Sequence, residues 1–359
     1  NLPMRDYFMK PVRPVTLGFR LIGISLAKYG IGLFPQAAVL FDIALHWRMP
    51  GSAPAIIRSV PGNDYLLTNA WAAIFAGMLG VSSHIGFYLF QLGLILVALL
   101  IPFALLSLTS GRERPWLLFM LLLGGPQVAV LLNWVGGYDT LSVIGCELAV
   151  LAGSLPVAVL GWGLLALNHP SLAILAWGFW LPMGCWFCGD LSRRQGLLAV
   201  FLPLVPIMLG ILSNQLAIQA WGGNTSRIVW LFQQDYSYYL KNYVEALPFV
   251  AWSVLGGGWL VLAEPRLLRL VETKILFLTA AVAAVLLPLI ALDETRVASL
   301  ALLPALLAYV RHVSVPHDAL LFGSRGIWYA LAAIAMPTVL VFGRTPGLYG
   351  WSWVVAFFD

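Results

Sequence analysis

The sequence predicts an all-α protein, a polytopic transmembrane helical bundle of about ten spans. Its 359 residues are 61% hydrophobic and only 10% charged, whereas a globular domain has roughly a quarter of its residues charged. The mean hydropathy is +0.90. Apolar runs long enough to cross a hydrocarbon layer of about 30 Å recur along the chain. Segments of alternating polarity, which a transmembrane barrel needs, are not seen in the sequence.

The first third of the chain is predicted as follows. Residues 1–28 form a basic flank that we expect on the cytosolic side, partly as a helix along the membrane interface. A first span then runs to about Trp47. Residues 48–85 form a first outer loop that is interrupted by Pro and Gly and contains short helices. A strong span over about 86–108 ends in a basic loop.

The remaining apolar runs predict further spans, at 116–134, 197–220, 246–263, 275–292, 297–310 and 327–343, with three shorter pieces near 140–153, 155–168 and 171–187. An aromatic outer loop covers 222–245. The short basic loops all fall on the side of the N-terminus, at 112–114, 193–194, 266–274 and 311–325. This agrees with the positive-inside rule. We therefore expect one transmembrane domain over residues 1–359, with membrane lipids and no nucleic acid as partners, since the charge of +5 follows from topology.

Three acids of the predicted outer face are candidates for chemistry. Asp42 lies inside the first span, where an ionisable group costs about 2–3 kcal/mol or more and usually has a task, although it could snorkel to the interface. Asp64 precedes Tyr65 and would either cap a helix or act in catalysis or metal binding. Asp139 follows two glycines and a tyrosine and has the same two interpretations.

A cluster of charged residues at 293–296 interrupts the apolar stretch "LIALDETRVASLALL". Asp293 and Glu294 end one predicted span, and Arg296 begins the next. A tight hairpin needs polar residues here, and an Asp–Arg pair three residues apart would stabilise it slightly. Arginine is also the preferred partner of phosphate. Arg227 and Arg296 are cations on the face that the positive-inside rule otherwise depletes, so both are candidates for anion binding.

The loop at 222–245 contains several aromatic residues, among them Trp230 and Tyr238. Such residues suit the membrane interface, and they would equally suit stacking on a sugar ring. The five histidines are scattered, so the sequence has no metal-binding constellation. Cys185 and Cys188 form a CxxC inside an apolar run and are interpreted as structural thiols.

Taken in order, these segments resemble the GT-C superfamily of integral membrane glycosyltransferases. "WVGGYDTLSVIGCELAVL" resembles the glycine-x-Asp/Asn helix start of mannosyltransferase-like members, and "FDIALHW" followed by "GSAPAIIRSVPGNDYLLTNAWAAIFAGMLG" resembles their first outer loop. The likeness covers roughly residues 30–165 and rests on short motifs. The chain departs from the pattern because it has Asn63–Asp64 in place of a paired acidic motif.

The resemblance implies an enzyme that moves a sugar from a polyprenyl-phosphate donor to a glycan or lipid-linked acceptor, in the bacterial inner (plasma) membrane with its site on the periplasmic or outer side. Asp42 or Asp64 would be the general base and Asp139 a supporting acid. Charge alone suggests Arg227 and Arg296 as donor-phosphate ligands. Asp293, Glu294, Tyr65, Trp230 and Tyr238 are expected to support the site. A divalent cation, Mg²⁺ or Mn²⁺, held by Asp42 or Asp64 stays open.

Three other functions fit the same sequence. A polysaccharide polymerase or O-antigen-ligase-like enzyme would share the lipid-linked substrate and would depend on arginines more than on carboxylates. A transporter of a lipid-linked substrate usually shows internal repeats, and none is evident here. A non-catalytic subunit of a membrane complex is the third alternative.

Overall fold

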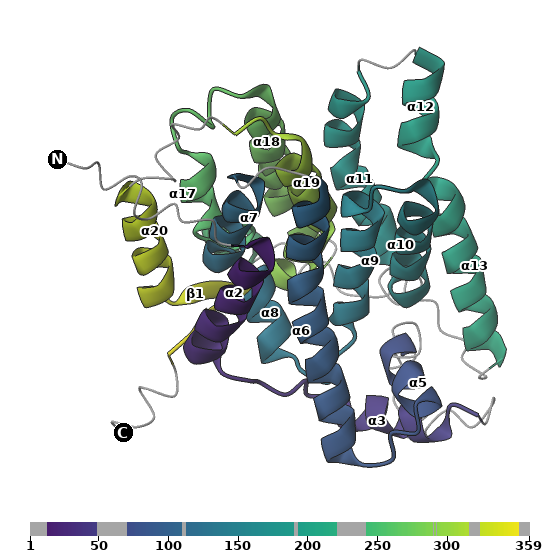
Figure 1. The fold of residues 1–359 in the computed structure, drawn as a ribbon. Helices are drawn as coiled ribbons and strands as arrows, with labels where there is room; N and C mark the ends of the chain where they lie inside the picture. Colours follow the sequence, from purple (N-terminus) through teal and green to yellow (C-terminus); the bar gives the residue numbers. More distant parts are fainter. Residues whose placement is uncertain are drawn as a thin grey trace.

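The computed structural model describes residues 13–48, 70–109, 113–189, 193–220, 242–289, 291, 293–315 and 324–351. The described chain is mostly helical and forms a bundle of upright helices (Figure 1). In chain order the helices are α2 (Pro14–Tyr29), α3 (Ala37–His46), α5 (Trp71–Met78), α6 (His84–Thr109), α7 (Glu113–Gly124), α8 (Gln127–Asn133), α9 (Asp139–Leu151), α10 (Leu155–Asn168), α11 (Pro170–Phe187), α12 (Arg193–Phe201), α13 (Leu204–Ala220), α16 (Tyr243–Ser253), α17 (Gly258–Leu262), α18 (Val271–Leu286), the short 3-10 turn η2 (Leu287–Leu289), α19 (Glu294–His312) and α20 (Ser324–Ala335).

Four helical segments are long and apolar enough to cross a membrane, namely His84–Leu108, Pro170–Phe187, Gly196–Ala217 and Val271–Leu289. A fifth results if α7 and α8, which are bent by 57° relative to each other, form one span. The structure thus supports a mainly helical membrane protein, and its described residues support four or five spans, not the predicted number of about ten. Several apolar runs are short helices such as α10, whose 14 residues extend only about 21 Å.

The predicted flank at 1–28 contains helix α2, whereas the predicted first span, which runs from there to about Trp47, contains only the short helix α3. α2 ends at Tyr29 and is followed by Gly30, whose φ of 65° is left-handed and favours glycine. The segment after it pairs with the end of α8, because Gly32 N donates to Leu132 O at 2.8 Å and Phe34 N to Val135 O at 2.9 Å. The 10-residue α3 then lies with α5 at the bottom of the view, beside the start of α6 (Figure 1).

The centre of the bundle is formed by α9 and α19, which are buried on nearly every side. α10 lies closely against α9 because glycines face each other across the contact. A Cβ on Gly145 would come within 2.9 Å of Leu165 N, and a Cβ on Gly161 would collide with the backbone of Ala149. Close helix approach through small residues is typical of membrane bundles.

The predicted span at 327–343 is also wrong, because the chain forms α20 and then an antiparallel hairpin. β1 (Thr338–Phe342) pairs with β2 (Thr345–Tyr349) in the register Thr338↔Tyr349 to Phe342↔Thr345. Gly343 and Arg344 form the two-residue turn with φ of 57° and 67°. Two positive φ values suit a type I′ turn, whose twist matches that of the strands. Tyr29 Oη, on α2, hydrogen bonds Thr338 Oγ1 at 2.6 Å and anchors the hairpin.

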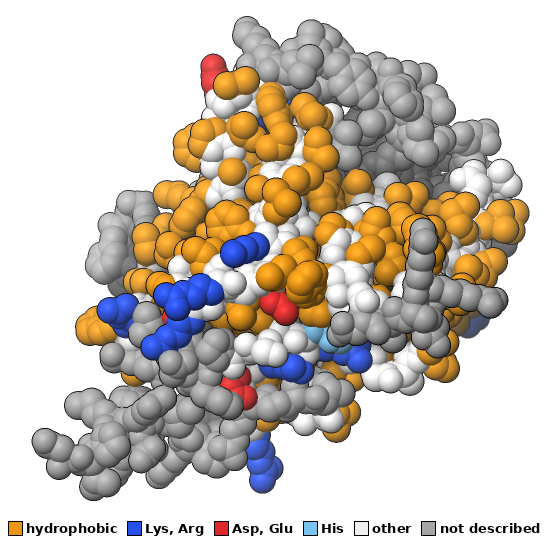
Figure 2. Space-filling model, turned by 90° about the horizontal axis from the view of Figure 1, so that it is seen from above, with side chains coloured by type: hydrophobic (Ala, Val, Ile, Leu, Met, Phe, Trp, Pro, Cys, Tyr) orange, Lys and Arg blue, Asp and Glu red, His pale blue; other side chains and the backbone are white. Residues whose placement is uncertain are grey.

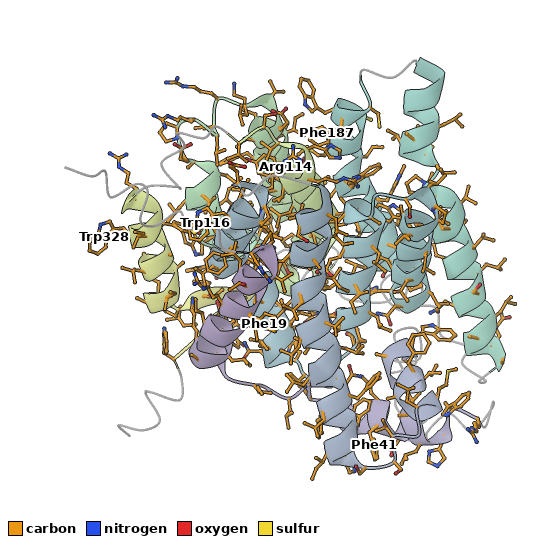
Figure 3. The ribbon with its side chains drawn as sticks, in the orientation of Figure 1. Phe19, Phe41, Arg114, Trp116, Phe187 and Trp328 are labelled. Atoms are coloured by element: carbon orange, nitrogen blue, oxygen red, sulfur yellow. The ribbon has the colours of Figure 1, made fainter. Side chains whose placement is uncertain are left out.

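Basic side chains lie at the upper end of the bundle (Figure 2). Figure 2, seen from above, shows Lys and Arg side chains among the apolar ones. Arg114 and Phe187 lie toward the top in Figure 3, whereas Phe41 of α3 lies at the bottom. Arg114 Nε donates to Val313 O at 3.3 Å, and Phe187 stacks on His312 with ring centroids 4.4 Å apart. Which end faces the cytosol stays a prediction from the positive-inside rule.

Candidate functional site

A buried arginine joins the first turns of α9 and α19. Arg296 Nη1 donates to Tyr138 Oη at 2.7 Å and lies 3.4 Å from Asp139 Oδ2. Arg296 Nη2 donates to Asp293 Oδ2 at 2.7 Å. Its guanidinium carbon also lies 4.9 Å from the centroid of the Trp134 ring. We call these five residues the Arg296 cluster.

The cluster combines a buried part with an accessible part. The side chains of Arg296 and Asp139 are 3% and 8% exposed, whereas that of Asp293 is 43% exposed. A guanidinium holds its carboxylate partners in a fixed geometry because its donors are rigid and always charged. Arg296 therefore holds the Asp293 carboxylate at the surface of the described structure.

The formal charge of the cluster is negative. One guanidinium faces two carboxylates, from Asp139 and Asp293. A phosphate approaching Arg296 would meet both of these acids, and like charges repel strongly where water is scarce. The two carboxylates thus disfavour the approach of a phosphate to Arg296. Phosphate binding by Arg296 stays a prediction.

Aromatic rings enclose the cluster on several sides. The ring of Tyr138 meets Phe34 edge to face with centroids 5.4 Å apart, and Trp134 contacts Phe342 of β1 at 4.8 Å. Asn168, at the end of α10, donates from Nδ2 to the backbone oxygen of Tyr138 at 2.7 Å. The cluster is thereby held by α8, α9, α10 and the hairpin together.

The residues beside Arg296 dock the C-terminal hairpin. Glu294 Oε1 accepts from Arg344 N at 3.1 Å and lies 3.2 Å from Arg344 Nη1. Thr295 Oγ1 donates to Ser253 Oγ at 2.6 Å and accepts from Val341 N at 2.8 Å. Burial raises the pKa of Glu294, at the first position of α19, to about 7, although Arg344 acts in the opposite direction.

The charged residues at 293–296 and Thr295 between them therefore make two separate sets of contacts. Asp293 and Arg296 belong to the cluster with Asp139, whereas Glu294 and Thr295 hold the hairpin. The predicted Asp–Arg pair three residues apart is present, as Asp293 and Arg296. The sequence did not indicate the participation of Tyr138, Trp134 or Arg344. The only available signal for Tyr138 was its place directly before Asp139 in "GGYD".

The other predicted site residues lie elsewhere or are not described. Asp42 lies on α3 and is half-buried, and its backbone oxygen hydrogen bonds the His46 ring at 2.9 Å. Within the described ranges no hydrogen bond or ion pair joins the Asp42 carboxylate to Arg296. The remaining predicted site residues lie outside the described part of the chain: Asp64, Tyr65, Arg227, Trp230 and Tyr238.

Metal-ligating side chains do not cluster in the described part of the chain. There, no three His, Cys, Asp or Glu side chains lie close enough together to hold a metal ion. The prediction of a divalent cation named Asp42, which lies in that part, or Asp64, which lies outside it. Cys185 and Cys188 are free thiols, exposed and half-buried respectively.

Compared with known protein families, curated proteins and solved structures, the chain has no match in any of the three.

Proposed function

We propose that the chain is an integral membrane glycosyltransferase that moves a sugar from a polyprenyl-phosphate donor to a glycan or lipid-linked acceptor. The observation that carries this proposal is the Arg296 cluster, in which a buried guanidinium presents a half-exposed Asp293 carboxylate where α9 and α19 begin. Buried, paired ionisable groups in membrane proteins usually have a function because they are costly to keep there.

The donor must be lipid-linked if the reaction takes place on the non-cytoplasmic face. Nucleotide sugars are cytosolic and do not reach that face, whereas a polyprenyl chain can enter between apolar helices. Exposed apolar side chains of the described spans offer such contacts, for example Leu89 on α6 and Leu278 on α18, which are 63% and 66% exposed.

The chemical step needs one base and one cation. The acceptor hydroxyl oxygen forms a bond to the anomeric carbon while the bond from that carbon to the phosphate oxygen breaks. A carboxylate takes the hydroxyl proton, and the phosphate leaves with the bonding electron pair. We assign the role of general base, which accepts this proton, to Asp293. Asp42 and Asp64 are the alternatives that the resemblance implies. Arg296 acts as a positioning residue.

The departing phosphate needs a positive charge that Arg296, facing two carboxylates, supplies poorly. Arg227 remains the predicted phosphate ligand. The proposed inverting reaction combines Asp293, the N-cap residue of α19, with the Arg227 cation of the 222–245 loop.

The test is a transfer assay with the full chain in liposomes, using radiolabelled polyprenyl-phosphate mannose and polyprenyl-phosphate glucose with a short glycan acceptor. We expect Asp293→Asn to lower kcat at least a hundredfold, which is the usual contribution of a general base. Glu272→Gln, in the first turn of α18, is the matched control and should leave transfer unchanged.

Two results would reject parts of the proposal. If Asp293→Asn, Asp42→Asn and Asp64→Asn all keep transfer intact while Arg227→Ala abolishes it, the chain is a polymerase or ligase that depends on arginine. If neither donor is consumed by the wild-type chain with any acceptor, the assignment as a mannosyl- or glucosyltransferase is wrong.

A further inference from the structure

Two interrupted helices meet at glycine-rich breaks inside the bundle. α7 and α8 are separated by Gly125 and Pro126 and bend by 57°. α16 and α17 are separated by a stretch that includes Gly256 and Gly257, where Gly256 has a φ of 53°. Gly257 N donates to Gly124 O at 2.7 Å, so the backbone of one break hydrogen bonds the backbone of the other.

This junction requires glycine because the two chains approach so closely. A Cβ on Gly256 would lie 2.7 Å from Gly124 O, and a Cβ on Gly257 would lie 3.2 Å from Gly124 Cα. Tyr329, on α20, covers the contact, and its hydroxyl lies 2.9 Å from Gly257 O and 3.3 Å from Met120 O. Three separate parts of the chain therefore bring oxygen atoms to one place.

The second observation is the buried side chain of Gln127. Gln127 begins α8 directly after the break and is 3% exposed. Both polar atoms of its carboxamide, Oε1 and Nε2, are buried without a hydrogen-bond partner. A Cβ on Gly125 would collide with Oε1, so this oxygen lies against the break. An unpaired buried amide is costly, and nearly all such groups in folded proteins have a partner.

We propose that the junction binds a monovalent metal cation, with Gln127 Oε1 as its side-chain ligand. The oxygen atoms placed here are backbone carbonyls, a phenol and a carboxamide, all of them uncharged. Ca²⁺ and Mg²⁺ sites use carboxylates, whereas Na⁺ sites at broken membrane helices use unwound backbone carbonyls and the carbonyl ends of half-helices.

The helix ends favour a cation. α7 has 12 residues and ends at Gly124, and α16 has 11 residues and ends at Ser253, just before the second break. The C-terminus of each helix carries a partial negative charge. Pro126 also has no N–H, so the carbonyl of Leu122 lacks the donor that a continuous helix would supply four residues later.

The experiment compares the thermal unfolding of the full chain in detergent in NaCl, KCl and choline chloride at equal ionic strength. Bound cation stabilises the folded state according to its concentration over its Kd, so at saturating cation we expect a rise in Tm of about 2 °C or more over choline. The NaCl and KCl arms identify which ion binds.

Gln127→Leu removes the oxygen ligand and should abolish the cation-dependent rise. Gln91→Leu is the matched control, because Gln91 on α6 is 1% exposed and also has both amide atoms buried without partners, but lies inside a continuous helix. This variant should keep the rise. A second measurement, ²³Na line broadening with the wild type and both variants, reports binding without unfolding.

Several outcomes overturn the proposal. A wild-type Tm that is the same in all three salts means that the junction holds water or nothing. A rise that survives in Gln127→Leu places the cation elsewhere. If Gln91→Leu loses the rise as well while both variants remain folded, the effect is not local to the break. None of these results depends on the proposed transferase activity.

Discussion

Removal of the Arg296 side chain tests the cluster most directly. In Arg296→Met the carboxylate of Asp139, only 8% exposed, would lose its cation inside the bundle. Breaking a buried ion pair from one side costs about 3–5 kcal/mol because one charge stays buried without its partner. We expect the free energy of unfolding to fall by that amount, and two hydrogen bonds of 2.7 Å would be lost with it.

A double-mutant cycle separates the buried pair from the accessible one. Asp139→Asn combined with Arg296→Met removes both charges, so the double variant should recover about 2 kcal/mol of the loss. Asp293→Asn alone should cost less than about 1 kcal/mol, because the Asp293 side chain is 43% exposed and its pair is screened by solvent.

The assay is SDS-induced unfolding of the detergent-solubilised chain, followed by circular dichroism. Arg325→Met, on an exposed position of α20, is the control and should change the free energy by less than about 0.5 kcal/mol. A loss below about 1 kcal/mol in Arg296→Met, or a double variant as unstable as the sum of the single ones, would refute the interpretation of a buried, interdependent pair.

Four further predictions concern other contacts. Burial raises the pKa of Glu294 from 4.5 to about 7, so between these values the folded chain keeps a proton that the unfolded chain has lost. Glu294 thus makes stability fall as pH rises through that window, and Glu294→Gln should remove this part of the pH profile. Burial, together with the charges of Arg311 and Arg114, lowers the pKa of His312 from 6.5 to about 4. The folded chain therefore loses stability as pH falls from about 6.5 to 4, and His312→Gln should remove this loss. Equal pH profiles of stability for the wild type and both variants would contradict this pair of predictions. Thr295→Val should destabilise the chain by about 1–3 kcal/mol in the SDS assay because Val341 N–H loses its acceptor. Thr345→Val removes an exposed hydroxyl, serves as the control and should change the free energy of unfolding little. Gly161→Ala should cost about 1–3 kcal/mol because its Cβ collides with Ala149, whereas Gly178→Ala, with nothing within 4 Å, should be neutral or slightly stabilising; equal effects would argue against the close α9–α10 contact.

Much of the helical content could be predicted from the hydropathy pattern. The span predicted at 86–108 is α6, and the shorter pieces near 140–153, 155–168 and 171–187 are α9, α10 and α11. The number of spans could not be predicted in the same way. An apolar run predicts burial in lipid or in protein equally well, and several of these runs are short helices buried by their neighbours.

Several residues of the candidate site could be predicted from the sequence, but the contacts between them could not. Asp139, Asp293 and Arg296 were singled out because charge is rare in this chain and all three adjoin a predicted helix end. Their meeting depends on contacts between helices that are 157 residues apart in sequence. Asp42, which the same reasoning placed first, lies on α3, apart from this contact network.

The hydropathy of each segment, read without coordinates, was enough to establish that the chain is helical and apolar and where its rare charges stand. This works because a helix satisfies its own backbone hydrogen bonds within one stretch of sequence. Only the packed molecule decided that Arg296 meets Asp139, that the last strands fold back onto α19 and that two glycine breaks touch. Those contacts depend on the shapes of surfaces from distant segments, and no local pattern encodes which surface lies opposite.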